Sequence, residues 1–156
     1  MNKKIKITSI VAVLYVIAFL FTGKHTNPPV SNTVSWDSPE TEATFYRACA
    51  DCHSNETKWP WYSNFPPVSW AIILHVNEGR EHFNISVPKM GHADEAAEEV
   101  EFDNMPMGQY RIMHPEALLN DAERTIFVDG LKATFGASKS ENHDDDDDGD
   151  DERHHN

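Results

Sequence analysis

The sequence predicts an all-α fold, in which one transmembrane helix precedes a small domain of three or more helices with long loops. Three segments carry apolar residues at helical spacing, and no strand pattern longer than four residues appears. Near the N-terminus an apolar run follows three lysines. The chain has 156 residues, which leaves about 100 for a single folded domain once its two ends are set aside.

Residues 1–22 are predicted to form a signal anchor that spans the membrane. Lys3, Lys4 and Lys6 precede the apolar run of residues 7–21, as is typical of an export signal. The run from Ile5 to Thr22 is just long enough to cross a bilayer, which takes about 17–25 residues. Bulky side chains stand where a cleavage site needs small ones, which favours a retained anchor over a cleaved signal peptide. We therefore expect a single-pass protein of the inner membrane, with its C-terminal domain in the periplasm.

Composition divides the rest of the chain into three parts. Residues 23–40 are rich in Pro, Ser and Asn, as linkers are, and residues 41–136 make the folded domain. Residues 137–156 are predicted to be a disordered acidic tail, since residues 141–156 lack apolar side chains and carry −8 of the net charge of −13. No basic cluster lies beyond the N-terminal segment, so a nucleic-acid partner is not expected.

Three helices can be placed in the domain. The first covers about residues 40–50 and follows Ser38-Pro39, a capping serine with a first-turn proline. The second covers about residues 69–83. The third ends near Phe135 and begins after Asn120, where the pattern Asn-Asp-Ala-Glu predicts a capping box.

The only two cysteines stand in the sequence Cys49-Ala50-Asp51-Cys52-His53. Cys-x-x-Cys-His is the attachment sequence of c-type haem, in which two thiols join one porphyrin and the histidine becomes the proximal iron ligand. A redox-active dithiol, a zinc site completed by a distant histidine, and a short disulfide are the alternatives. Because the motif occurs once, the expected cofactor is one covalently attached haem c held by Cys49, Cys52 and His53.

The segment after the motif is aromatic and irregular. Residues 59–67 contain three prolines, which exclude regular structure, among four aromatic side chains. Two compatible interpretations are that these aromatic side chains cover a porphyrin edge or that they form a small core of their own.

The distal iron ligand is predicted to be Met105. It lies in a loop ahead of the last helix, and Pro106 restricts it to extended backbone. A thioether ligand raises the redox potential relative to two histidines. Met90, Met107 and Met113 are assigned to core packing. The histidine rivals are His114, which is the first to test, and then His75, His82 and His92.

The sequence also resembles a known family, the haem-binding domain family of exported bacterial proteins. The stretches that carry the resemblance are residues 49–63, Pro67-Val68-Ser69-Trp70, Glu78-Gly79-Arg80, Asn104-Met105-Pro106, Tyr110 and His114-Pro115-Glu116-Ala117. The resemblance covers most of residues 41–135, but neither the segment 90–102 nor the acidic tail. It implies a cytochrome c-like domain with Cys49 and Cys52 as covalent anchors, and with His53 and Met105 as axial ligands.

These observations favour a membrane-tethered monohaem c-type cytochrome that carries single electrons in the periplasm. Its expected partners are the membrane, through the N-terminal helix, and an unknown redox protein. Two strong axial ligands leave no open site for a substrate, so an electron carrier is favoured over an enzyme. The alternative is a haem peroxidase-like enzyme, or a haem-based sensor of gas or redox state, with an open or displaceable distal ligand.

Overall fold

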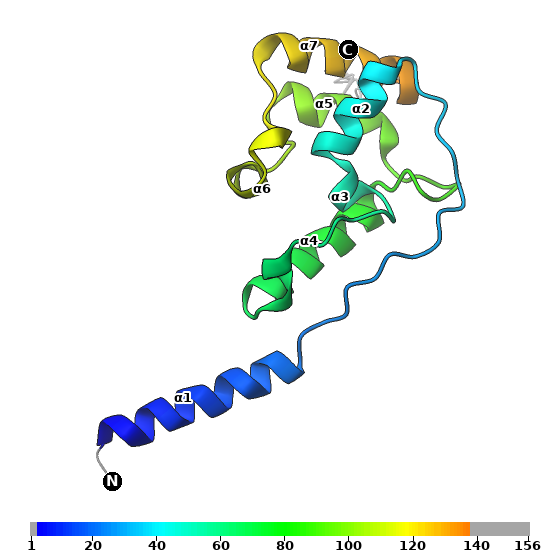
Figure 1. The fold of residues 1–156 in the computed structure, drawn as a ribbon. Helices are drawn as coiled ribbons and strands as arrows, with labels where there is room; N and C mark the ends of the chain where they lie inside the picture. Colours follow the sequence, from blue (N-terminus) through cyan, green and yellow to red (C-terminus); the bar gives the residue numbers. More distant parts are fainter. Residues whose placement is uncertain (1–2, 138–156) are drawn as a thin grey trace, which may run out of the picture.

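The computed structural model describes residues 3–137, and every regular element within this range is a helix (Figure 1). The helical class of the sequence prediction therefore agrees with the structure. The longer helices are α1 (Lys3–Leu20), α2 (Pro39–Ala48), α4 (Val68–His82) and α7 (Asp121–Phe135). The short ones are α3 (Ala50–His53), α5 (Ala96–Glu101), α6 (Gly108–Met113) and the 3-10 turns η1 (Trp61–Asn64), η2 (Ala93–Glu95) and η3 (Pro115–Ala117).

The prediction of a transmembrane helix is wrong. Within residues 3–137, no helix is both long enough and apolar enough to cross a membrane. The N-terminal end of α1 carries Lys3, Lys4 and Lys6, so its uncharged part is confined to residues 7–20. At 1.5 Å per residue this part is about 21 Å long, against a hydrocarbon core of about 30 Å. The signal anchor over residues 1–22, the membrane as a partner and the inner-membrane, periplasm-facing location are corrected accordingly.

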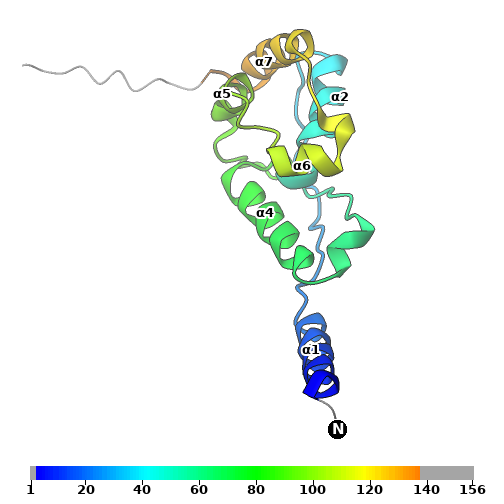
Figure 2. The same ribbon diagram turned by 90° about the vertical axis from the view of Figure 1, so that its left-hand side faces the viewer.

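Much of the expected linker is an extended strap that contacts the domain. Residues 23–36 run from α1 toward α2 beside the other helices (Figures 1 and 2). The backbone N–H of Ser31 donates to the carbonyl of Ser86 at 2.9 Å, and the side-chain amide of Asn32 donates to that of Ile85 at 3.0 Å. These bonds fix the strap to the segment that follows α4. The predicted tail lies outside the described residues from position 138 onward.

Local sequence signals begin two of the helices. The Ser38 hydroxyl accepts a hydrogen bond from the Thr41 backbone N–H at 3.2 Å, and Pro39 is the first residue of α2. In α7 the Asn120 side chain accepts from the backbone N–H of Glu123 at 3.0 Å. The Glu123 carboxylate accepts in return from the backbone N–H of Asn120 at 3.1 Å, which completes the capping box. Such caps satisfy N–H groups that a helix leaves unpaired.

The core lies between α2, α5 and α7 and supports the cavity described below. Phe45 of α2 packs edge-on against Phe83, at 5.8 Å between ring centroids, and Phe83 packs against Phe135 of α7 at 5.3 Å. Trp36 of the strap contacts both Phe45 and Phe135. Edge-to-face pairs of this kind stabilise a core beyond the apolar area they bury. Further buried members of this core are Val100, Phe127, Val128 and Leu131.

Candidate functional site

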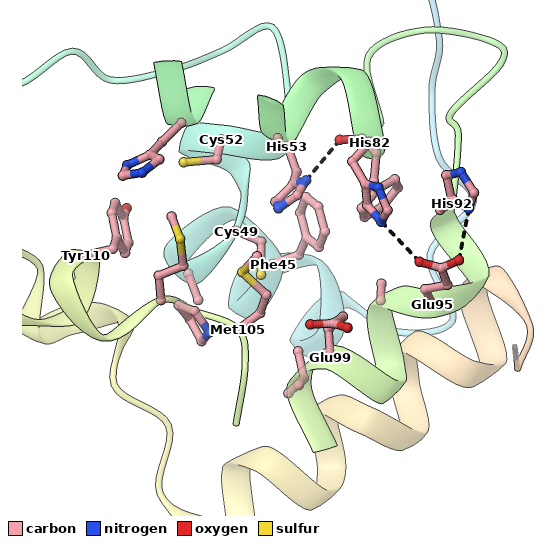
Figure 3. Close-up of a pocket in the computed structure, with 18 of the residues that line it drawn as sticks. Phe45, Cys49, Cys52, His53, His82, His92, Glu95, Glu99, Met105 and Tyr110 are labelled. Carbon is pink, nitrogen blue, oxygen red and sulfur yellow. Dashed lines mark hydrogen bonds and ion pairs between the residues drawn. The ribbon is translucent and has the colours of Figure 1, made fainter. Parts of the chain in front are cut away.

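The two cysteines and the adjacent histidine lie on a single helical turn. Helix α2 ends at Ala48, and the next residue, Cys49, still donates its backbone N–H to the Phe45 carbonyl at 2.8 Å. The chain turns at once into α3, where the backbone N–H groups of Cys52 and His53 both donate to the Cys49 carbonyl, at 3.1 and 3.0 Å. Ala50 is buried beneath this turn. The turn therefore presents Cys49, Cys52 and His53 to the same space (Figure 3).

Burial raises the pKa of both thiols and so favours their neutral form. The structure contains no disulfide between them. Desolvation raises the pKa of Cys49 to about 12 and that of Cys52 to about 11, and the charge of Asp51 contributes to the second shift. Redox-active dithiols have lowered thiol pKa values, so the dithiol alternative finds no support here. The part of the chain described by the structure also lacks any group of three or more potential ligands arranged to hold a metal ion.

The His53 ring is held by its Nδ1 atom. Nδ1 lies 2.9 Å from the carbonyl oxygen of Phe83, an acceptor, which assigns the ring proton to Nδ1 and leaves Nε2 with a free lone pair. Burial lowers the pKa of His53, while hydrogen bonds to the backbone oppose that effect. A neutral imidazole with its second nitrogen bonded to a carbonyl is the usual form of a metal-ligating histidine.

A close helix contact sets the position of the motif. Gly79 of α4 packs against Cys52 so tightly that an added Cβ would lie 2.8 Å from the Cys52 carbonyl oxygen. Only glycine allows this approach, which brings α4 directly against α3. Arg80 strengthens the same contact, because its Nε donates to the carbonyl of Ser54 at 2.8 Å.

All four predicted site residues line one largely apolar cavity of about 330 Å³. This volume lies at the lower end of the range for ligand pockets, about 300–1,000 Å³. Cys49, Cys52 and His53 line one side, and Met105 reaches the same space from the loop after α5 (Figure 3). Apolar walls come from α2, α5, α7 and the 105–107 loop, through Phe45, Ala48, Ala96, Val100, Pro106, Met107 and Leu131.

Backbone hydrogen bonds anchor the loop that carries Met105. The backbone N–H groups of Asn104 and Met105 both donate to the Glu99 carbonyl, each at 3.0 Å. Pro106 is buried, and the peptide bond that precedes it is cis. Met107 also lines the cavity, so its sequence assignment to the core is incomplete, although its sulfur accepts a 3.6 Å bond from the Gln109 side chain.

The first histidine rival lies outside this cavity. His114 Nε2 is 3.0 Å from the Tyr62 hydroxyl, and its Nδ1 is 3.0 Å from the Glu116 carboxylate. Its ring stacks on Tyr110 with 4.2 Å between centroids. Both ring nitrogens are therefore occupied, and His114 contributes instead to a second, smaller cavity behind Tyr110.

The other histidine rivals do line the cavity. His82 and His92 stack with 4.7 Å between ring centroids and share Glu95, at 3.0 and 2.9 Å to its two carboxylate oxygens (Figure 3). Each therefore has one ring nitrogen committed to that carboxylate. His75 of α4 also lines the cavity.

Several wall residues escaped the sequence analysis. Glu95 and Glu99 come from the segment 90–102, which the resemblance could not match. Tyr110 lies beside Cys52, and its hydroxyl donates to the Asp51 carboxylate at 2.8 Å. Burial and that carboxylate raise the pKa of Tyr110, so the hydroxyl keeps its proton. Tyr110 was named only as a position that carries the family resemblance, and that was the signal that could have pointed to it.

The aromatic segment 59–67 does not line the main cavity. Trp59 stacks on His25 of the strap with 4.5 Å between ring centroids, and Trp61 packs edge-on against Tyr62 and Phe65. Trp61 and Phe65 are 76% and 46% exposed, so these ring contacts form no buried core, and the structure supports neither interpretation of this segment.

Comparison with known families agrees with the cavity and the motif. The model of a family described as a haem-binding domain matches residues 12–133. The chain belongs to this haem-binding domain family. The sequence resemblance is thereby confirmed, and haem is the cofactor of this protein. No curated protein and no solved structure matches the chain.

Proposed function

We propose that this haem-binding domain carries one haem c and transfers single electrons. Cys49 and Cys52 are the thioether anchors, and His53 and Met105 are the axial iron ligands. The observation that carries the proposal is the turn of α3, which presents two neutral thiols and a carbonyl-bonded imidazole to the cavity that Met105 also lines.

The donor set fits the group. The wall near the thiols is apolar, as a porphyrin face requires, and the free Nε2 of His53 belongs to a neutral ring. When bound, the haem iron supplies one-electron redox chemistry, and ligands on both faces favour electron transfer over substrate binding.

The protein's own residues hold and tune this centre. The Phe83 carbonyl orients the His53 ring and strengthens its basicity through the Nδ1–H bond. The contact of Gly79 with the Cys52 backbone fixes the second thiol. The Glu99 carbonyl, which accepts from two successive N–H groups, holds the loop that presents Met105. The buried core under Phe45 and Leu131 keeps water from the cavity floor.

A spectroscopic comparison of two methionines tests the proposal. Methionine ligation of ferric haem gives a far-red thioether-to-iron charge-transfer band, which Met105→Ala should abolish. Met107→Ala is the matched control, because Met107 lines the same cavity one residue beyond Pro106, and it should keep the band.

Two outcomes would contradict the assignment. Loss of the band in Met107→Ala but not in Met105→Ala would move the ligand to Met107. A wild-type protein that lacks the band and binds carbon monoxide readily would have an open distal face, and would favour the peroxidase-like or sensor alternative.

A further inference from the structure

The turn before Met105 adopts an unusual backbone conformation. Asp103 has a φ of 60°, and within the described residues no other non-glycine residue has a positive φ. The left-handed region is unfavourable for side chains other than those of glycine, asparagine and aspartate. At this turn α5 ends, and the next two N–H groups reverse direction to bond the Glu99 carbonyl. The path of the chain toward Met105 therefore depends on Asp103.

The Asp103 carboxylate joins two further helices to this turn. Its Oδ1 atom lies 2.7 Å from Nη1 of Arg111 on α6 and 2.6 Å from Nη2 of Arg124 on α7. Arg124 also donates through Nη1 to the Val100 carbonyl, at 2.9 Å, in the last turn of α5. Three helices thus meet at one carboxylate, two residues before the proposed ligand.

We propose that Asp103, Arg111 and Arg124 form an ionic clamp that positions Met105 against the haem iron. Asp103 is a positioning residue in this clamp, since its carboxylate acts through the loop and not on the iron. The proposal rests on the proposed function, in which Met105 is the distal ligand. It adds that the methionine stays bound because α6 and α7 restrain its loop.

The physical reason lies in the cost of ordering a loop. A ligand on a free loop loses conformational freedom when it binds, whereas a restrained loop has lost that freedom already. The two arginine side chains are 22% and 20% exposed and the Asp103 side chain is 52% exposed, so water screens these pairs in part. Two charged hydrogen bonds to one oxygen also fix the direction of the carboxylate.

The clamp predicts how an added ligand competes with Met105. Exogenous imidazole binds the ferric iron only when the methionine is off, so its apparent affinity reports the fraction of protein with a free distal face. Removal of the Asp103 charge should raise that affinity by roughly 3- to 10-fold, as expected for the loss of partly exposed ion pairs. The far-red band should weaken in parallel.

The experiment uses the haem-loaded full chain and a set of matched variants. Asp103→Asn removes the charge but keeps a residue that tolerates positive φ. Asp129→Asn is the control, because it removes the same charge from an exposed position on α7. Arg111→Gln leaves the Asp103–Arg124 pair in place, so it should show a smaller effect even if the aspartate variant fails to fold. Met105→Ala sets the upper limit of imidazole affinity.

The outcomes separate the clamp from the ligand assignment. Tighter imidazole binding in Asp103→Asn and Arg111→Gln, with no change in Asp129→Asn, supports the clamp. If Met105→Ala abolishes the band while the Asp103 and Arg111 variants match the control, the clamp is overturned and the ligand stands. If Met105→Ala keeps the band, the ligand assignment fails, and the clamp as a positioning device for that ligand fails with it.

Discussion

Replacement of Gly79 by alanine should push α4 away from the turn that carries the motif. The new Cβ would lie 2.8 Å from the Cys52 carbonyl oxygen, 3.1 Å from its Cβ and 3.2 Å from its carbonyl carbon. A carbon–oxygen contact normally spans about 3.3 Å or more, so the two backbones must separate by roughly 0.5 Å. All three atoms belong to a short, packed helix, and no flexible side chain is present to move aside.

The net cost follows from two opposing terms. Overpacking costs about 1–3 kcal/mol, and a clash with backbone atoms that cannot move aside places Gly79→Ala in the upper part of this range, at about 2–3 kcal/mol. Alanine in a helix interior returns about 1 kcal/mol relative to glycine. The free energy of unfolding should therefore fall by about 1–2 kcal/mol. For a domain of this size, that lowers the melting temperature by roughly 5–15 °C.

Thermal unfolding of the haem-loaded protein, followed by circular dichroism, measures the effect of Gly79→Ala. Gly108→Ala is the matched control, because the nearest atom to its added Cβ is 3.9 Å away, at the end of the Arg111 side chain. The control should be neutral or slightly stabilising. The yield of covalently attached haem should also fall in Gly79→Ala, because the Cys52 backbone is displaced. Equal melting temperatures and equal haem yields for the two variants would refute this account of the α3–α4 contact.

Three further changes test the surrounding structure. Arg80→Lys should lower the free energy of unfolding, measured in urea, by about 1–3 kcal/mol. The Arg80 guanidinium donates four hydrogen bonds to the strap and to residues after α3, and lysine cannot reproduce them. An unchanged free energy of unfolding would show that Arg80 does not hold the strap. Phe127→Ala should cost about 3–5 kcal/mol, since its ring is 1% exposed, and a loss below about 1 kcal/mol would contradict the described core. The Asn120 backbone N–H and then Arg47 lower the pKa of Glu123 from its ordinary 4.5, so its stabilisation is present above that value and is lost as pH falls through the folded pKa. Glu123→Gln should therefore flatten the acid-side fall in melting temperature, and an identical acid profile would exclude Glu123 as a contributor.

Local signals predicted the long helices of the domain well. The serine–proline start of α2 and the capping box of α7 each depend on residues within one helical turn, which a sequence displays directly. The Cys-x-x-Cys-His turn is equally local, and in the structure its cysteine and histidine side chains face one space.

Other features depend on contacts between distant residues and leave little trace in the sequence. The strap looked like a linker because its hydrogen bonds reach Ser86 and Ile85, more than 50 positions away. The wall from residues 93–101 was missed because two short helical elements give too few residues for a periodic pattern. The clamp at Asp103 depends on arginines from two later helices.

The predicted transmembrane helix failed for a different reason. Lysines occupy the N-terminal end of α1, so a segment counted as just long enough is too short once they are excluded. Apolar composition alone could not distinguish a helix of this length from one that spans a bilayer.

Mass spectrometry of the denatured protein tests covalent haem attachment, the central claim, most directly. We expect the wild-type chain to retain the mass of one haem after unfolding, whereas the Cys49→Ser, Cys52→Ser double variant should have the mass of the polypeptide alone. The double variant should also lose its colour when extracted with acid and organic solvent. A double variant that keeps its haem under denaturing conditions, or a wild-type chain that releases it, would contradict attachment through these two thiols.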